Sequence, residues 1–149
     1  MVCLGNICRS PLAEGIMERK ITELGLDWQV ESAGTGDWHI GQLPDQRSVE
    51  MARNYGIDIT CQRARQLKPH DLDHFDLVLA MDSQNYRDIL LLATTKEQEE
   101  KVQLIMNFMT PGRNQAVPDP YWDDNGFEKV FGMLEEACGK VLEQFNVRV

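Results

Sequence analysis

The run 75–81, Phe-Asp-Leu-Val-Leu-Ala-Met, constrains the fold more than any other segment of this chain. It is apolar at nearly every position and lacks the polar alternation of a strand that faces water on one side. Strands of this kind are typical of a parallel sheet covered by helices on both faces. A second apolar run covers 101–106, and a helix pattern lies between the two, over about 83–92. The order predicts strand–helix–strand units.

Other periodic segments extend this pattern along the chain. Apolar residues at helical spacing predict helices over 10–24, which Gly25 would end, over about 46–54 and over 127–145, whereas alternation predicts a short strand over 28–32. A length of 149 residues suits one folding unit. We therefore expect a three-layer α/β/α sandwich with a mostly four-stranded parallel sheet, formed by a single domain over residues 1–149.

The N-terminal segment carries the chemistry-bearing motif. Cys3 and Arg9 stand six positions apart and are followed by Ser10-Pro11, which reads as a helix start with a serine N-cap. The intervening backbone can curl around an anion, with the guanidinium and the positive end of the helix completing the ring. We call residues 3–9 the anion loop. Such a ring would also favour a thiolate nucleophile at Cys3. The alternative is a buried cysteine that ends a strand and an arginine on a solvated helix start.

Charge and cysteine usage narrow the classes of partner. A net charge of −9 argues against nucleic acid or an anionic membrane as partner. The four cysteines and three histidines show no metal-ligand spacing, so we expect no metal and no cofactor. Two of the thiols stand together in the anion loop, which fits a reducing cytoplasm. We see no apolar leader and no long apolar run that predicts export or membrane insertion.

The motif Val-Cys-Leu-Gly-Asn-Ile-Cys-Arg-Ser-Pro at 2–11 resembles the active-site loop of the low-molecular-weight protein tyrosine phosphatases. Asp119-Pro120-Tyr121 resembles their general-acid loop, and further similarity at 31–35, 64–66 and 80–82 extends the likeness over nearly the whole chain. The resemblance implies a full strand leading into the loop. Only Met1 and Val2 precede Cys3 here, so we expect a first strand that is truncated at the N-terminus, through a misassigned start or a shortened chain.

The resemblance also implies the roles of individual residues in the hydrolysis of aryl phosphate monoesters. Cys3 would be the nucleophile, Arg9 would hold the phosphate and Asp119 would act as general acid and base. Ser10 would steady the sulfur, and Ser32 and Asp82 would support the loop. The predicted substrate-binding residues are Leu4, Gly5, Asn6, Ile7, Cys8, Ser10, Trp38, Tyr121 and Trp122. The partner would be a phosphotyrosine-containing protein or a small aryl phosphate, and the enzyme a monomer.

Several of these residues have a second interpretation from the sequence alone. Asp119 between two prolines is equally well explained as a turn residue. Asp82 follows a strand and can cap the next helix instead of orienting the loop. Asn6 can adopt a left-handed turn, or brace the loop through Ser32, or do both. Cys8 can be a small buried hydrophobe, or the thiol that traps oxidised Cys3 as a disulfide, which we favour.

Three other functions compete with a phosphotyrosine phosphatase. An arsenate reductase of this fold needs two further thiols beyond Asp82, where only Cys138 occurs. Phosphoarginine phosphatases of the family tend to carry threonine at the position of Ile7, and an apolar residue there suits phosphotyrosine. A silent phosphate-binding module would not need Cys3 and Asp119 together.

Overall fold

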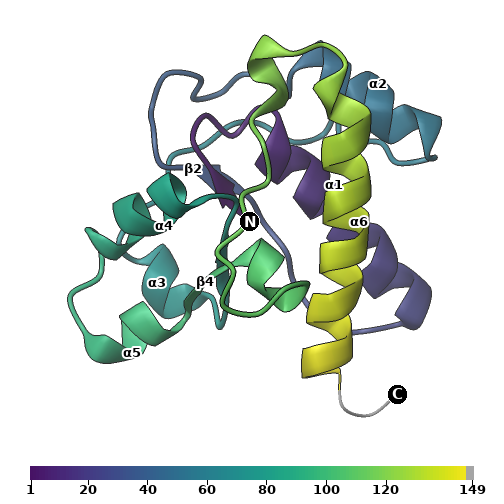
Figure 1. Cartoon of the computed structure of the whole chain (residues 1–149). Helices are drawn as coiled ribbons and strands as arrows, with labels where there is room; N and C mark the ends of the chain where they lie inside the picture. The colour runs from purple at the N-terminus through teal and green to yellow at the C-terminus, as the bar shows by residue number, and fades with distance from the viewer. Residues whose placement is uncertain (147–149) are drawn as a thin grey trace.

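The computed structural model describes residues 1–146, in which four short strands form one parallel sheet of order β2-β1-β3-β4 (Figure 1). The strands are β1 (Val2–Cys3), β2 (Ala33–Gly34), β3 (Val78–Ala80) and β4 (Val102–Leu104). The helices are α1 (Arg9–Leu24), α2 (Gln46–Asn54), α3 (Asp71–His74), α4 (Ser83–Leu90), α5 (Lys96–Glu100) and α6 (Gly126–Phe145), with 3-10 turns η1 (Ile105–Phe108) and η2 (Pro120–Trp122).

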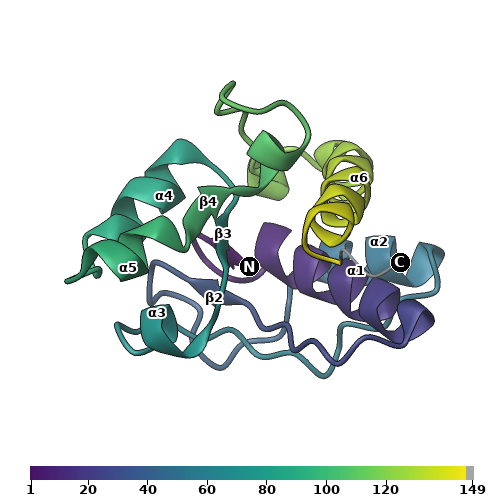
Figure 2. The same ribbon diagram turned by 90° about the horizontal axis from the view of Figure 1, so that it is seen from below.

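Helices cover both faces of the sheet, which gives the three-layer architecture predicted from the apolar runs. Seen from below, α1, α2 and α6 lie on one side of the strands, and α3, α4 and α5 lie on the other (Figure 2). Val2 in the central strand pairs with Ala33 on one side and with Ala80 on the other. The C-terminal end of β1 and the anion loop that follows it therefore lie at the carboxyl edge of the sheet, where proteins with parallel strands commonly bind ligands.

Two apolar cores follow from the alternation of side chains along the strands. Cys3, Leu79 and Met81 face a core built with α1, α2 and α6. Val2 and Ala80 face a second core that includes residues of α4. Because each strand buries both of its faces, an apolar run without polar alternation is what this position requires. No helix within residues 1–146 is long and apolar enough to cross a membrane.

Two local predictions were wrong. Residues 28–32 form no strand, and β2 lies at Ala33–Gly34 instead. The partner strand β1 begins at Val2, which pairs with Ala33, and the Ala33 N–H donates to the Met1 carbonyl oxygen at 3.0 Å. The pairing therefore begins at Ala33, and residues 28–32 lie before it. The helix α1 begins at Arg9 after Cys8, without a side-chain cap. Ser10 is not its N-cap, because the serine hydroxyl contacts other groups, described below.

Candidate active site

The Cys3 sulfur lies at the end of β1, at the base of the anion loop. It is 3.0 Å from the Ser10 hydroxyl oxygen, and the Asn6 backbone N–H donates to it at 3.3 Å. The cysteine is 3 % exposed. Hydrogen bonds from a hydroxyl and an amide stabilise a sulfur that carries negative charge, so the surroundings suit a thiolate.

Asn6 braces the anion loop from inside. Its φ of 57° lies in the left-handed region, which asparagine tolerates better than most residues. Its side-chain amide donates to the hydroxyl oxygens of Ser10 at 2.8 Å and of Ser32 at 2.9 Å, and its carbonyl oxygen accepts from the Arg65 N–H at 3.0 Å. Both interpretations of Asn6 therefore hold at once: it makes the turn and it ties the loop to β2 and to residue 65.

Arg9 is held in a fixed orientation beneath the loop. Its Nη1 donates to Asp82 Oδ2 at 2.7 Å and to the Val117 carbonyl oxygen at 3.1 Å, and the residue is 3 % exposed. Asp82 also accepts the Asn85 N–H at 2.8 Å through Oδ1, which caps α4. Both interpretations of Asp82 therefore hold, because one carboxylate oxygen caps α4 and the other orients the Arg9 guanidinium.

Asp119 approaches the same guanidinium from the loop 117–125. Its Oδ2 lies 3.9 Å from Arg9 Nη2, and its Oδ1 accepts the Tyr121 N–H at 3.1 Å. The side chain is 38 % exposed, in contrast to the buried arginine. Residues more than one hundred positions apart in the sequence therefore meet at one point, with a thiol, a cation and a solvent-accessible carboxyl group.

The backbone around the anion loop turns its carbonyl groups outward. The oxygens of Cys3, Leu4 and Ile7 accept N–H groups of Thr35, Gly36 and Asp45 at 2.8–2.9 Å. A Cβ on Gly34 would stand 2.7 Å from the Leu4 oxygen, so only glycine permits this close approach. Because those carbonyl dipoles point away, the interior of the loop faces the N-terminus of α1, which favours an anion.

These features agree with what comparison with known proteins shows. The family model described as low molecular weight phosphotyrosine protein phosphatase matches residues 1–149. The chain belongs to the low molecular weight phosphotyrosine protein phosphatase family. A protein from Synechocystis sp. named as a putative low molecular weight protein-tyrosine-phosphatase is 44% identical over 144 residues, covering 95% of this chain and 91% of that protein.

Solved structures agree on the fold. A protein tyrosine phosphatase from Entamoeba histolytica superposes with a TM-score of 0.90 at 34% identity, covering 97% of this chain and 94% of that one. A Drosophila arginine phosphatase gives a TM-score of 0.91 at 29% identity, covering 99% of this chain and 97% of that one. The α/β fold and the enzyme class predicted from the sequence, a phosphatase of the tyrosine-specific type, are confirmed.

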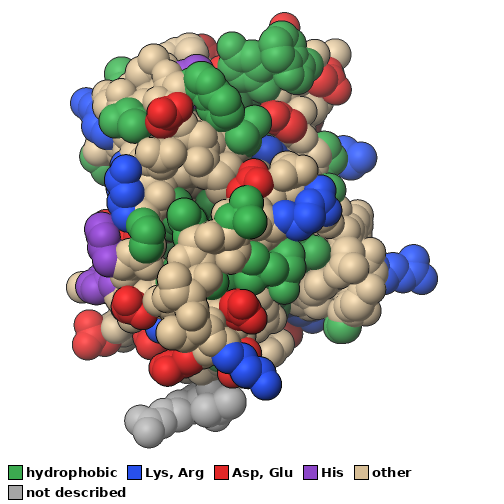
Figure 3. Space-filling view, turned by 90° about the vertical axis from the view of Figure 1, so that its left-hand side faces the viewer, with side chains coloured by type: hydrophobic (Ala, Val, Ile, Leu, Met, Phe, Trp, Pro, Cys, Tyr) green, Lys and Arg blue, Asp and Glu red, His purple; other side chains and the backbone are tan. Residues whose placement is uncertain are grey.

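Apolar side chains form an exposed rim on this phosphatase. Trp38 is 66 %, Trp122 is 87 %, Leu4 is 39 % and Tyr121 is 38 % exposed. Figure 3 shows hydrophobic side chains gathered at the upper end of the molecule, with acidic side chains among them. That end carries the segments 35–45 and 117–125 in Figure 1. Tyr121 and Trp122 meet edge to face with ring centroids 4.8 Å apart. These rings have no core to enter, which leaves them available to a flat ligand.

The second thiol of the anion loop, Cys8, is buried. It packs in a small apolar cluster with Ile7, Ala64 and Phe127. Burial raises the pKa of Cys8 to about 12, so this thiol stays protonated near neutral pH. Gly5, on the outer side of the loop, is packed against the ring of His39, because a Cβ there would stand 3.0 Å from His39 Cδ2.

Asp45 and Arg47 are site neighbours that the sequence analysis missed. Asp45 is the N-cap of α2, and its N–H donates to the Ile7 carbonyl oxygen at 2.8 Å. Arg47 contacts the loop 117–125 through Asp124 at 2.6 Å. The pair Pro44-Asp45 before a helical pattern is an N-cap signal that could have pointed to Asp45. Nothing local points to Arg47, because its partner lies 77 positions away.

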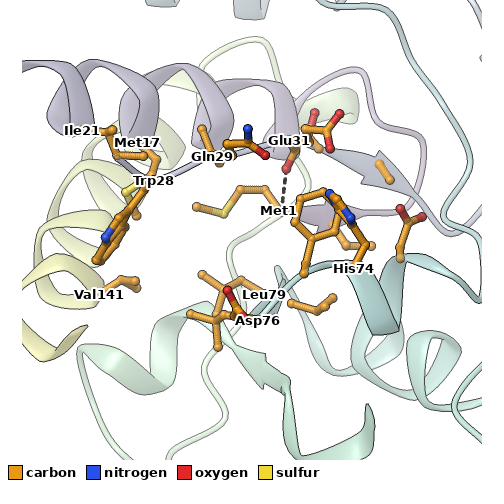
Figure 4. A pocket seen from close by; sticks show the side chains of 18 of the residues that line it. Met1, Met17, Ile21, Trp28, Gln29, Glu31, His74, Asp76, Leu79 and Val141 are labelled. Atoms are coloured by element: carbon orange, nitrogen blue, oxygen red, sulfur yellow. Dashed lines mark hydrogen bonds between the residues drawn. The ribbon is translucent and has the colours of Figure 1, made fainter. Parts of the chain in front are cut away.

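A cavity of about 530 Å³ lies apart from the anion loop, beside Met1. Figure 4 shows Met17, Ile21, Trp28, Leu79 and Val141 around it, with the Met1 ammonium donating to the Glu31 carbonyl oxygen. None of Cys3, Arg9 and Asp119 lines it. It adjoins the N-terminal end of β1, where residues 28–32 run without a paired strand, and it is separate from the candidate active site.

Proposed function

We propose that this phosphatase hydrolyses phosphotyrosine in proteins, and small aryl phosphates, with Cys3 as nucleophile, Arg9 as the phosphate-binding residue and Asp119 as general acid and base. The observation that carries the proposal is the approach of Arg9 to Asp119, 3.9 Å apart, beside a loop whose amide and hydroxyl groups contact the Cys3 sulfur. Binding, attack and proton transfer each require one of these groups.

In the first step the Cys3 thiolate attacks phosphorus and the bond to the leaving oxygen breaks. A phosphorus–sulfur bond forms, the Asp119 carboxyl group gives its proton to the departing phenolate, and a neutral phenol leaves. Arg9 and the N–H groups of the anion loop bind the equatorial oxygens, on which charge is spread in the transition state. Asp82 and the Val117 carbonyl oxygen hold the guanidinium for this task.

In the second step water attacks the cysteinyl-phosphate. The Asp119 carboxylate takes a proton from the water, the phosphorus–sulfur bond breaks, and inorganic phosphate leaves with the thiolate restored. The Ser10 hydroxyl, 3.0 Å from the sulfur, stabilises the departing thiolate. Asp119 thus alternates between acid and base, as one carboxyl group must in two successive displacements.

The preference for an aryl phosphate is supported by the walls of the site. Trp38, Tyr121 and Trp122 offer exposed rings on the flanking segments, whereas Ile7 is buried in the cluster with Cys8, Ala64 and Phe127. A phosphoarginine substrate is the second candidate, because one structural neighbour is described as an arginine phosphatase. An arsenate reductase is disfavoured, since the one cysteine beyond Asp82 is Cys138, and it is buried in α6.

Reversible oxidation is a further part of the proposal. Peroxide would oxidise the Cys3 thiolate to a sulfenic acid, and the Cys8 thiol would condense with it, releasing water and forming a disulfide. The raised pKa of Cys8 supports this order, because a protonated thiol is the slower of the two to react with peroxide. Thiols that must stay reduced suit a cytoplasmic enzyme. We further propose that it acts as a monomer, with no nucleic acid or membrane as partner.

The test is steady-state turnover on phosphotyrosine, phosphoserine and phosphoarginine side by side. Phosphotyrosine should have the highest kcat/KM. Cys3→Ser should abolish turnover while vanadate still binds, and Asp119→Ala should slow phenyl phosphate by about 10²-fold or more. A preference for phosphoarginine would replace the aryl specificity with the second candidate. Turnover that persists in Cys3→Ser would remove the nucleophile assignment.

A further inference from the structure

Arg47, near the start of α2, uses its whole guanidinium to join two segments beside the active site. Its Nε and Nη2 donate to the two carboxylate oxygens of Asp45, each at 2.9 Å. Its Nη1 donates to Asp124 Oδ1 at 2.6 Å and to the Tyr121 carbonyl oxygen at 3.1 Å. A planar fork that pairs with a carboxylate through two parallel bonds has a fixed orientation.

Two rings restrict the guanidinium further. Its central carbon lies 4.7 Å from the centroid of the Phe127 ring and 5.5 Å from that of Tyr121. Hydrogen bonds from Asp45 and then Asp124 raise the pKa of Arg47 above its usual value, so the side chain remains a cation throughout the working range. Cations at this distance from aromatic faces are attracted to them.

Both partners of Arg47 lead directly to the reacting groups. On one side, the Asp45 N–H donates to the Ile7 carbonyl oxygen of the anion loop at 2.8 Å. On the other, the Tyr121 N–H donates to Asp119 Oδ1 at 3.1 Å, so the residue whose carbonyl binds Arg47 also orients the Asp119 carboxyl group. A continuous series of polar contacts therefore runs from the loop that binds phosphate to the group that moves the proton.

We propose that Arg47 is the positioning residue of the general acid, because it fixes the loop 117–125 to α2 and thereby sets where the Asp119 carboxyl group stands over the anion loop. The inference rests on the role of Asp119 proposed above. Asp119 is 38 % exposed and its contact with Arg9 is a long 3.9 Å, so its own packing does not fix it. Proton transfer needs hydrogen-bond reach, and a shift of about 1 Å can cost about 10²-fold.

The test compares two substrates in Arg47→Met, which keeps an unbranched side chain at this position and removes its donors and its charge. We expect kcat/KM for phenyl phosphate, which reports the first step alone, to fall about tenfold, because its leaving group needs a proton. For nitrophenyl phosphate, whose leaving group departs as an anion, kcat/KM should fall less than about twofold. Inhibition by vanadate should stay within about twofold of its original strength, since Arg9 and the anion loop still bind the anion.

Two further variants keep the test independent of folding. Asp124→Ala removes one partner, whose side chain is 83% exposed, and it should give a smaller loss in the same direction. Combined with Arg47→Met, this substitution should add no further loss, because the contact between Arg47 and Asp124 is already absent in Arg47→Met. Arg53→Met, an exposed arginine at the end of the same helix, is the matched control and should leave both rates unchanged.

The outcomes separate this inference from the assignment of Asp119. Equal losses in kcat/KM on both substrates in Arg47→Met would overturn the positioning role and leave Arg47 a structural residue. Asp119→Ala serves as the reference and should discriminate between the two substrates more strongly than Arg47→Met. If Asp119→Ala slows both substrates equally, the assignment of Asp119 as general acid is wrong, and so is the role proposed for Arg47.

Discussion

The four thiols of this chain occupy different surroundings and should differ in reactivity. Burial raises the pKa of Cys8 and of Cys138 to about 12, whereas Cys61 is exposed and the Cys3 sulfur contacts the Ser10 hydroxyl at 3.0 Å. We expect iodoacetamide to label Cys3 and Cys61 and to spare Cys8 and Cys138 even at about pH 9, because alkylation requires the thiolate and the raised pKa of the last two keeps them protonated. Peptide mass spectrometry gives the site of each adduct.

Vanadate provides the control for this experiment. It should protect Cys3 by filling the anion loop and leave the labelling of Cys61 unchanged. Labelling of Cys8 at a rate comparable to that of Cys61 would contradict the buried, protonated state described for it.

Much of the site at residue level could be predicted because its signals are local. The spacing of Cys3 and Arg9 is such a local signal, because it lies within one loop. The contact of Asn6 with Ser32, 26 positions apart, is not local: it was expected only from the family resemblance, and it is present at 2.9 Å. The role of Arg47 could not be predicted, because a surface arginine two residues into a helix has no distinctive pattern. The role proposed for Arg47 depends on its contacts with Tyr121 and Asp124, which lie far from it in the sequence and come near it only in the folded chain.

Two helical glycines offer a matched pair at the level of secondary structure. A Cβ on Gly15 in α1 would stand 2.6 Å from Ile59 Cγ2 and 3.0 Å from Ile57 Cγ2, whereas a Cβ on Gly139 in α6 would meet nothing within 4 Å. Gly15→Ala should therefore lower the free energy of unfolding by about 1–3 kcal/mol through overpacking. Gly139→Ala should raise it by about 0.5–1 kcal/mol through helix propensity.

Urea unfolding of both variants measures the difference. An increase in stability for Gly15→Ala would mean that α1 can move away from the segment 57–59 without penalty, contrary to the tight packing found there.

Helices with a strong periodic pattern could be predicted closely, whereas strands, which depend on hydrogen bonds to a neighbouring strand, could not. The helix expected over 46–54 is α2 with the same bounds, and the helix expected over 127–145 begins one residue earlier. The strand expected over 28–32 is absent because a strand needs a neighbour as well as alternation. α3 and α5, of four and five residues, are too short for a periodic pattern to mark them.

The charge of the whole molecule should shape which phosphopeptides it accepts. The net charge is −9, and the loop 117–125, which contributes Tyr121 and Trp122 to the rim, also carries Asp119, Asp123 and Asp124. A phosphotyrosine peptide with lysines on both sides should have a KM at least about threefold lower than one with glutamates, because complementary charge favours encounter. Measurement at low salt and again at about 1 M should show the difference shrinking.

Equal KM values for the two peptides at low salt would contradict this expectation. A peptide with serines on both sides gives the reference, and its KM should fall between the other two. A lower KM for the glutamate peptide would mean that the field of the anion loop outweighs that of the surface.

The position of β1 in the middle of the sheet has a consequence for folding during translation. Val2 leaves the ribosome well before one of its strand partners, Ala80. Asp119, whose carboxyl group lies 3.9 Å from the Arg9 guanidinium, is made later still. A nascent chain therefore carries Cys3 and Arg9 long before the residues that complete the candidate site have been translated.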